Sequence, residues 1–487
     1  MTDAPLWPPA ALEAATGGSF RGESRPILGA SIDTRSLEPG DLFFAIRGEA
    51  RDGHDFVPAA LGKGAGAAVV AAARAHEFEG AGPVLAVPGE GDDPVLDAMR
   101  RLGLAARART GAAIVAVTGS VGKTGTKEAL RHVLSAQGAT HASVASYNNH
   151  WGVPLTLTRM PEATRFGVFE IGMNHGAEIL PLTAMVRPDV ALITTVEPVH
   201  IEHFRSLSAI ADAKGEIFSG LKPGGVAVIN RDNPNYERLL AHAQASQAGR
   251  VITFGEHAAA DVCAHRILTR PDVSVVDATV MGIPVTYQLG TPGRHVAMNS
   301  LGVLACIHAL GADLARAALS LASLKPPVGR GERTALRIAD GEAFLVDESY
   351  NANPASIRAA LATLAGIDTG ARGRRIAVLG DMKELGAAGE TLHRELADAV
   401  AANGIDLVFA VGPLMTHLFE ALPMPVRGTA APTAEGVIDA VLATLRPGDA
   451  VMVKGSNSMR MVRIVEAVKA RYAVAPDPRE ASLNAVR

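Results

Sequence analysis

One stretch, IVAVTGSVGKTGTKEAL at residues 114–130, constrains the fold of this chain more than any other. It begins with a short apolar, β-branched run, 114–117, which is typical of a buried parallel strand. A glycine-rich loop follows, and Lys123 and Thr124 then open a helical pattern that continues through Leu130. Backbone N–H groups at such a strand-to-helix turn point at one spot, and the helix dipole favours an anion there. The stretch therefore predicts a nucleotide-phosphate site.

In phosphate-binding loops of this kind the lysine reaches the β- and γ-phosphates and the next hydroxyl ligates Mg²⁺, which are the roles expected of Lys123 and Thr124. The spacing departs from the common G-x-x-x-x-G-K-[ST] pattern, because Val117 stands five residues before Gly122 and the loop is one or two residues shorter. A glycine-rich turn that binds nothing has similar glycines, but Lys-Thr at the helix start favours phosphate binding. The predicted phosphate-loop residues are Thr118, Gly119, Ser120, Val121, Gly122, Lys123 and Thr124.

Length and composition indicate a soluble protein of about three domains, because 487 residues exceed one ordinary hydrophobic core. The net charge of −4 argues against general nucleic-acid binding, which needs a basic surface. Cys263 and Cys306 have no metal-ligand spacing and cannot form a disulfide framework, which suits a reducing cytosol. The N-terminus does not resemble a signal peptide, and no apolar run approaches the roughly 20 residues that cross a bilayer. We expect a cytoplasmic monomer that neither binds nucleic acid nor inserts into membranes.

The expected fold is α/β with three domains. Strand-like runs alternate with helical patterns in the central region, which is the signature of a parallel sheet. Lys325–Gly331 is the clearest linker because its two prolines cannot continue a helix. The alternation resumes afterwards as in a Rossmann-like domain, but no G-x-G-x-x-G follows its first strand, which argues against a dinucleotide site. The expected domains are 1–108, 109–328 and 329–472 with a disordered tail at 473–487, and the expected strands are 42–46, 67–71, 114–117, 167–171, 190–195, 226–230, 251–254, 343–347, 375–380, 407–411 and 450–454.

Three polar residues of the central region follow predicted strands, where open α/β sheets bind ligands. Glu170 ends one strand, His200 follows the next, and Lys214 lies in a helical pattern soon after. A lone histidine or lysine in such a place is more often an ordinary surface residue. Beside a phosphate loop, however, Glu170 and His200 are also suited to Mg²⁺, which takes carboxylate and phosphate oxygens. Because histidine is a less usual partner of Mg²⁺, both interpretations of His200 remain open.

Other polar segments can be interpreted either as local capping residues or as binding residues. The stretch 31–35 precedes a turn and, taken alone, is typical of residues that cap that turn. The loop 148–154 is an extended polar segment of the kind that carries binding residues on a rigid sheet. Gly293–His295 opens a helix that carries Asn299 and runs to about Leu310, and its polar start is also consistent with capping.

Taken together, the motifs resemble those of the Mur ligases, in the same order, from about residue 27 to residue 465. YNANP and GDMKELG are the most specific, and they are similar to the members that add D-Ala-D-Ala to a UDP-linked muramoyl tripeptide. The diaminopimelate-adding members carry D-N-P-R in the C-terminal domain, whereas Asp232–Asn235 here reads D-N-P-N and lies in the central region, so we interpret it as an accident. The motifs that carry the resemblance are TGSVGKTGTKE, YNNHWGVPLTL, FEIGMNHGAEI, VHIEHF, AKGEIF, GRH with Asn299, VGRG, DESYNANPAS, GDMKELG and VKGSNSMRM.

The resemblance implies an ATP-dependent ligase that forms an amide bond through an acyl phosphate in the cytoplasmic stage of peptidoglycan synthesis. It implies that the first domain binds the UDP-sugar substrate, the central P-loop domain binds ATP with Mg²⁺, and the third domain helps to hold the incoming amine. Its substrates would be UDP-N-acetylmuramoyl-tripeptide and D-Ala-D-Ala.

The resemblance also implies roles for individual residues. Relatives have Asn after the His of GRH, and Val296 stands there in this chain, which leaves an adenine contact from that position in question. In relatives the lysine that matches Lys214 carries CO₂ as a carbamate, which turns a cation into a carboxylate-like Mg²⁺ ligand. The implied residues are Ser31, Asp33, Thr34, Arg35, Asn148 and Asn149 for the UDP-sugar substrate; Thr118–Thr124, Asn299, Arg330 and Glu348 for ATP; Thr124, Glu170, His200 and Lys214 for metal; Ser349, Tyr350, Asn351 and Asn353 for the dipeptide; and Lys123, Glu170, His200, Lys214 and Arg330 for catalysis.

This chemistry matches the residues available. Activating a carboxylate with ATP and attacking it with an amine both build negative charge on oxygens, so the site needs Lys, Arg and Mg²⁺ more than a covalent nucleophile. The sequence contains no Ser/His/Asp or Cys/His arrangement that calls for one. Two alternatives remain: a folylpolyglutamate synthetase, against which YNANP and GDMKELG speak, and a nucleotide-binding module or switch without ligase activity. ATP hydrolysis that depends on both an acceptor carboxylate and an amine would separate them.

Overall fold

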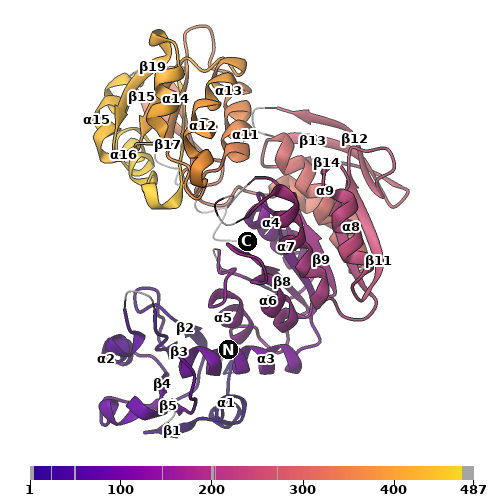
Figure 1. Cartoon of the computed structure of the whole chain (residues 1–487), viewed down its shortest axis with the longest axis vertical. Coiled ribbons are helices and arrows are strands. Elements are labelled where there is room, and N and C mark those ends of the chain that lie inside the picture. Colours follow the sequence, from indigo (N-terminus) through magenta and orange to yellow (C-terminus); the bar gives the residue numbers. More distant parts are fainter. Residues whose placement is uncertain are drawn as a thin grey trace.

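The computed structural model describes residues 5–23, 25–48, 51–144, 146–198, 202, 204–270, 273–339 and 341–473. Within these residues the strands form three sheets that follow one another along the chain. Figure 1 shows them as three bodies, with the magenta central sheet between the indigo N-terminal and the orange C-terminal sheets. The expected α/β class with three domains is confirmed.

The N-terminal sheet has the order β1-β5-β4-β3-β2, in which only β1 is antiparallel to its neighbour. The helix α3 packs on this sheet and also contacts α5 of the central region, so it joins the two bodies. Asp93 caps α3 by accepting from the N–H groups of Val95 and Leu96. The elements are α1 Pro9–Thr16, β1 Ser19–Arg21, β2 Gly29–Ser31, β3 Asp41–Phe44, α2 Val57–Gly62, β4 Ala67–Ala71, β5 Val84–Val87 and α3 Pro94–Arg109.

The central sheet has the order β14-β13-β12-β11-β10-β9-β6-β8-β7 and is parallel from β7 to β12. The helices α4, α9 and α10 cover one face, and α5, α6, α7 and α8 cover the other. The elements are β6 Ala113–Thr118, α4 Lys123–Ser135, β7 Thr140–Ala142, α5 Gly152–Thr158, β8 Phe166–Glu170, α6 Ile179–Val186, β9 Val190–Ile193, α7 Leu207–Gly215, β10 Gly225–Asn230, α8 Tyr236–Gln244, β11 Ala248–Gly255, β12 Val262–Thr269, β13 Ser274–Val280, β14 Ile283–Leu289, α9 Arg294–Ala309 and α10 Leu314–Ser320.

The expectation of a parallel central sheet is wrong at one end, where β13 and β14 run antiparallel to their neighbours. Only Met281 and Gly282 separate these two strands, and both have positive φ, 50° and 84°. A two-residue connection with this backbone makes a hairpin, because a parallel crossover needs a dozen residues or more. The hairpin lies at the far edge of the sheet from the phosphate loop.

The C-terminal sheet has the order β15-β16-β20-β17-β18-β19, and only β15 is antiparallel to its neighbour. Neither helix nor strand is found in the linker Lys325–Gly331, as expected. Among the described residues, no helix is both long and apolar enough to cross a membrane. The elements are β15 Glu332–Ile338, β16 Gly341–Glu348, α11 Pro354–Ala365, β17 Arg375–Gly380, α12 Gly389–Arg394, α13 Leu396–Ala402, β18 Leu407–Val411, α14 Met415–Ala421, β19 Arg427–Ala431, α15 Glu435–Thr444, β20 Ala450–Lys454 and α16 Val462–Tyr472.

Candidate active site

The predicted phosphate loop lies between β6 and α4, and its backbone requires glycine at two positions. Gly119 and Gly122 have φ of 150° and 86°, values that residues other than glycine rarely adopt. A methyl group on Gly119 would overlap the hydroxyl of Thr194, and one on Gly122 would overlap the amide of Asn299. Asn299, predicted from the sequence as an ATP-site residue, therefore packs directly against the phosphate loop.

The segment that follows β9 holds this loop in place. The Thr194 hydroxyl donates to the carbonyl of Val121 over 2.6 Å, and the Ser120 N–H donates to the carbonyl of Thr195 over 2.8 Å. Asn233 supports the same segment through its side-chain amide, which donates to Thr195 Oγ1 at 3.0 Å and to the Val196 carbonyl at 3.1 Å. The D-N-P-N stretch therefore contributes to the architecture of the central domain.

Lys123 lies at the mouth of the loop as the first residue of α4. Its ammonium donates to the carbonyl of Gly119 over 2.6 Å. Protein surrounds the side chain on several sides although it keeps some contact with solvent, and this burial lowers the pKa of Lys123. The Glu170 carboxylate opposes the shift and the Arg330 guanidinium adds to it. A group from the central sheet and one from the linker to the C-terminal sheet therefore act on the same ammonium.

Thr124 and Glu170 meet beside Lys123, because β8 is a direct neighbour of β6 in the sheet. The Thr124 hydroxyl donates to Glu170 Oε2 over 2.9 Å, and the Asn148 amide donates to Oε1 over 2.7 Å. Glu170 is 1% exposed. A hydroxyl and a carboxylate are hard oxygen donors of the kind that Mg²⁺ takes together with phosphate oxygens and water. Among the described residues, no cluster of three His, Cys, Asp or Glu side chains suited to a metal occurs.

Lys214 is buried on α7, with 2% of its surface exposed. Burial lowers its pKa well below the ordinary value, and repulsion from Lys123 adds to the shift. A buried ammonium in this position is costly, because it is removed from water and lies near a second cation. His200, the other predicted residue of this group, lies outside the described residues.

The linker and the end of β16 form the junction between the central and C-terminal sheets. The Arg330 guanidinium lies over the ring of Tyr350, 4.2 Å from its centroid, and the Tyr350 N–H donates to the Gly329 carbonyl over 3.1 Å. Gly329 allows this approach, because a methyl group there would lie 3.0 Å from Tyr350 Cβ. The predicted residues Arg330 and Tyr350 are thus brought together.

Two other residues predicted to bind the dipeptide, Ser349 and Asn353, make hydrogen bonds to neighbouring residues of the chain. Asn353 caps α11: its side-chain oxygen accepts from the Ser356 N–H over 2.8 Å, and its own N–H donates to Ser356 Oγ over 2.9 Å. The Ser349 hydroxyl donates to Asp347 Oδ1 over 2.6 Å. Both residues shape the turn after β16.

Lys454 is a site residue that the sequence analysis did not single out. It ends β20, is almost fully buried, and donates to Glu348 Oε2 over 3.0 Å and to the Asn351 carbonyl over 2.9 Å. Lys454 therefore fixes two residues predicted to bind ligands. The sequence feature that could have identified Lys454 as a site residue is its position in VKGSNSMRM, at the end of a predicted strand.

On the N-terminal sheet, the predicted substrate residues 31–35 follow the carboxyl end of β2. Ser31 donates to the Asp33 carbonyl over 3.0 Å, and Asp33 accepts from both the backbone and the guanidinium of Arg35. The hydrogen bond with Arg35 lowers the pKa of Asp33. The Thr34 carbonyl accepts from Lys63 over 2.8 Å. The turn-capping interpretation thus describes their contacts within the chain, while the Arg35 side chain remains largely exposed.

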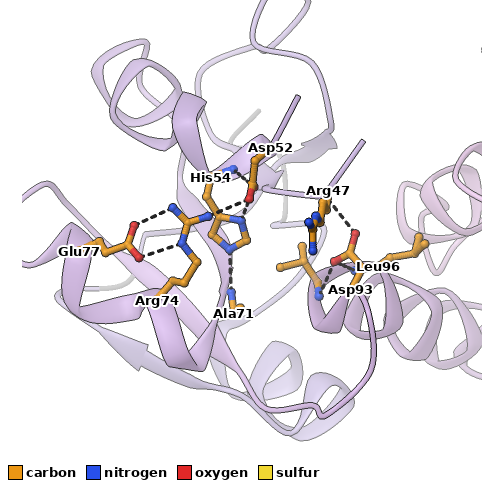
Figure 2. A network of polar contacts seen from close by, with 9 residues as sticks. Arg47, Asp52, His54, Ala71, Arg74, Glu77, Asp93 and Leu96 are labelled. Atoms are coloured by element: carbon orange, nitrogen blue, oxygen red, sulfur yellow. Dashed lines mark hydrogen bonds and ion pairs between the residues drawn. The ribbon is translucent and has the colours of Figure 1, made fainter. Parts of the chain in front are cut away.

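A second network, shown in Figure 2, ties together the carboxyl ends of β3, β4 and β5. His54 Nδ1 lies 2.8 Å from Asp52 Oδ1, and His54 Nε2 accepts from the Ala71 N–H over 3.1 Å. Arg74 donates to the other oxygen of Asp52 and pairs with Glu77. This network links the segment after β3 to the end of β4.

The two predicted asparagines of the loop 148–154 have separate positions. Asn148 joins the Glu170 group, as described above, whereas Asn149 accepts from the Gly152 N–H over 2.9 Å at the start of α5. Asn148 therefore belongs with the phosphate loop, and Asn149 organises the helix that leads back to the N-terminal sheet.

Comparison with known proteins is consistent along the whole chain. Three family models match in order: "Mur ligase family, catalytic domain" at residues 26–113, "Mur ligase middle domain" at 117–307, and "Mur ligase, glutamate ligase domain" at 329–457. The UDP-N-acetylmuramoyl-tripeptide–D-alanyl-D-alanine ligase of Escherichia coli is 35% identical over 93% of this chain and 96% of its own length. The ligase of the same name from Rickettsia prowazekii is 30% identical over 89% and 94%.

Solved structures show the same arrangement. MurF from Acinetobacter baumannii superposes with a TM-score of 0.81 at 27% identity, covering 96% of this chain and all of that one. MurF ligase from Thermotoga maritima, solved in complex with ADP, superposes with a TM-score of 0.72 at 25% identity and covers 91% and 97%.

Proposed function

The chain belongs to the Mur ligase family, and from this premise we propose that it joins D-Ala-D-Ala to UDP-N-acetylmuramoyl-tripeptide at the expense of ATP. The relatives that support this substrate pair match the chain over about nine-tenths of its length or more. The observation that most directly supports this function is the buried Thr124–Glu170 hydrogen bond beside Lys123.

We assign the substrates to the three domains in chain order. Residues 1–108 hold the UDP-sugar substrate, 109–328 hold ATP, and 329–472 hold the incoming amine, with 473–487 as a tail. The position of residues 31–35 at the carboxyl edge of the N-terminal sheet supports the first assignment, since parallel sheets bind ligands at that edge. The phosphate loop supports the second, and the meeting of Arg330 with Tyr350 at the junction supports the third.

In the proposed reaction the acceptor carboxylate attacks the γ-phosphorus of ATP and displaces ADP, which gives an acyl phosphate. The amine of the dipeptide then attacks the acyl carbon, and the tetrahedral intermediate loses phosphate to leave the amide. Negative charge grows on phosphoryl and carbonyl oxygens in both steps. Lys123 and Arg330 are the cations placed to stabilise that charge, and the N–H groups of residues 118–124 orient the phosphates. Asn299 braces the loop, and Lys454 holds Glu348 toward the nucleotide side of the junction.

Magnesium fits the oxygen donors Thr124 and Glu170, and it would supply neutralisation of phosphate charge when bound. Glu170 is oriented for this role by Asn148. His200 and Lys214 complete the proposed metal group. Burial of Lys214 favours its neutral amine, the form that adds CO₂ to give a carbamate, and the carbamate would offer oxygens where an ammonium would repel a cation.

The amine-binding group that we propose, Ser349, Tyr350, Asn351 and Asn353, is uncharged. Ser349 and Asn353 are engaged in the turn after β16, and Asn351 Oδ1 accepts from the Ala352 N–H over 2.9 Å. We therefore assign the contact with the dipeptide to the Tyr350 side chain and the Asn351 amide NH₂ group. We also propose that the protein acts as a cytoplasmic monomer in cell-wall biogenesis, and through it in cell shape and division.

One incubation tests the proposal: the protein with UDP-N-acetylmuramoyl-tripeptide, D-Ala-D-Ala, ATP and Mg²⁺, followed by mass measurement of the product. The expected product is heavier than the acceptor by the dipeptide minus water, and ADP appears only when both acceptor and amine are present. ADP release without an amine product would favour a nucleotide switch. Product from a folate and glutamate in place of the muramoyl substrates would favour folylpolyglutamate synthetase.

A further inference from the structure

The loop 381–389, which carries the GDMKELG motif after β17, reaches from the C-terminal domain to the central domain. At its tip, a methyl group placed on Gly386 would lie 3.4 Å from Cα and Cβ of Glu202. Glu202 belongs to the VHIEHF segment and stands two positions after His200. The tip bends through two left-handed residues in close succession, Glu384 with φ of 63° and Gly386 with φ of 52°. Such a backbone persists only where its surroundings hold it in place.

A single side chain closes the base of this loop from within. His393 is fully buried on α12. Its Nε2 accepts from the N–H of Met382 over 2.9 Å, and its Nδ1 donates to the carbonyl of Gly389 over 2.6 Å. These partners are the second and the last residues of the loop. Only the neutral imidazole with its proton on Nδ1 can make both bonds at once.

The surroundings of His393 keep it neutral. Burial lowers its pKa, and the charged groups that face it act in both directions: Asp381 favours the protonated ring, and Lys383 and His417 oppose it. Asp381 is itself fully buried and occupied, since it accepts from the Met415 N–H over 2.8 Å and from Lys383 Nζ over 3.0 Å. If Nε2 carried a proton, its N–H and the Met382 N–H would face each other as two donors with no acceptor between them.

We propose that His393 is a positioning residue that staples the two ends of the loop 381–389 and so holds its tip against Glu202 when the C-terminal domain meets the central domain. The inference rests on the proposed ligase function, in which the two domains must come together over the reacting groups. His393 touches neither substrate nor phosphate loop. It acts through the loop, by fixing where the tip of the C-terminal domain meets Glu202.

The loop supplies its own reporter, because the Lys383–Glu384 bond is a trypsin site on it and the Lys383 side chain is 42% exposed. We compare the full-length protein with His393→Phe, which keeps the ring and removes both hydrogen bonds, and with His393→Gln, whose amide can accept and donate without titrating. His417→Gln is the matched control, since that histidine lies nearby on α14 and touches neither end of the loop. For each, the rate of cleavage after Lys383 is measured by mass spectrometry, with kcat and KM for D-Ala-D-Ala.

For His393→Phe we expect about tenfold faster cleavage after Lys383 and a drop of about tenfold in kcat/KM, as two buried hydrogen bonds are lost. Cleavage at sites elsewhere should stay unchanged. His393→Gln and His417→Gln should stay within about threefold of the parent. Because closing the loop lowers the pKa of His393, protons favour the open loop as pH falls below about 6.5. The parent should therefore lose activity there more steeply than His393→Gln.

Unchanged cleavage and kinetics in His393→Phe would overturn the proposal. Faster cleavage at all sites together would also overturn it, because His393 would then support the domain as a whole. If the parent forms no dipeptide product but the cleavage pattern is as expected, the proposed substrates are wrong while the loop staple stands.

Discussion

The hydroxyl of Thr124 donates to Glu170 Oε2 over 2.9 Å, although the two residues are 46 positions apart in the chain. The contact joins the first turn of α4 to the carboxyl end of β8, and it exists because β6 and β8 pair in register from Ala113–Phe166 to Val117–Glu170. Phosphate loop and carboxylate therefore share one site by the pairing of their strands.

The first prediction concerns Lys123. Lys123→Ala should lower kcat about 10²–10³-fold by removing a charge that stabilises the transition state. The free energy of unfolding should change little, since the ammonium supports no apolar core. Steady-state ADP release in the complete assay and thermal unfolding check this. Lys222→Ala is the control, because Lys222 pairs with Asp189 just before β9, at the amino ends of the strands and away from the phosphate loop at their carboxyl ends. Near-normal turnover in Lys123→Ala would show that the loop assignment is wrong.

The second prediction concerns the close approach of Asn299 to Gly122. Gly122→Ala should destabilise the fold by about 1–3 kcal/mol, because its φ of 86° is unfavourable for alanine and the methyl group overlaps the Asn299 amide. The KM for ATP should rise as the loop shifts. Gly125→Ala is the matched control: a methyl group there meets open space on α4, so stability should hold or increase by up to about 1 kcal/mol. Equal unfolding curves for the two variants would contradict the packing described.

Much of this site could be predicted from the sequence because its signals are local. The glycines, the Lys-Thr pair and the change from a strand to a helix pattern place the loop, and β8 ends at Glu170 as predicted. What one sequence cannot give is the long-range partner. Lys454 meets Glu348 across 106 positions, and Asn299 of α9 meets Gly122 at the start of α4 on the same face of the sheet.

The antiparallel strands β13 and β14 were not expected from the sequence for a different reason. The turn between β13 and β14 is Met281-Gly282, and methionine is not among the residues that usually mark a tight hairpin. In the same way, Asn353 and Ser349 have the residue types of a binding loop and of a helix entry, and the capping contacts of both became visible only in the structure.

The third prediction concerns Lys214. Lys214→Ala should be nearly inactive, and short carboxylic acids that fit the vacated space should restore part of the activity by replacing the carbamate oxygens. Burial lowers the pKa of Lys214 and so favours the neutral amine, which is the form that reacts with CO₂. The activities of Lys214→Ala and of the control Lys123→Ala are measured with and without acetate. Acetate should not rescue the control. Full activity of Lys214→Ala would exclude a functional carbamate.

The last prediction concerns the amine donor. D-Ala-D-Ala should be preferred over D-Ala, L-Lys and meso-diaminopimelate by about 10²-fold or more in kcat/KM, measured in a competition assay with one acceptor. The reason is the charge of the residues at the junction between the central and C-terminal sheets. Tyr350 and Asn351 are neutral, and the Lys454 ammonium is already paired with Glu348. The charged side chain of L-Lys or meso-diaminopimelate would be left without a partner there, and a buried unpaired charge costs far more than a missing apolar group. D-Ala lacks a charged side chain but also lacks the second residue of the dipeptide and its contacts. The stretch Asp232–Asn235 does not supply such a partner, since Asn233 is bound to Thr195 and Val196 within the central domain. Preference for a single amino acid would contradict this account of specificity and leave the ligase chemistry intact.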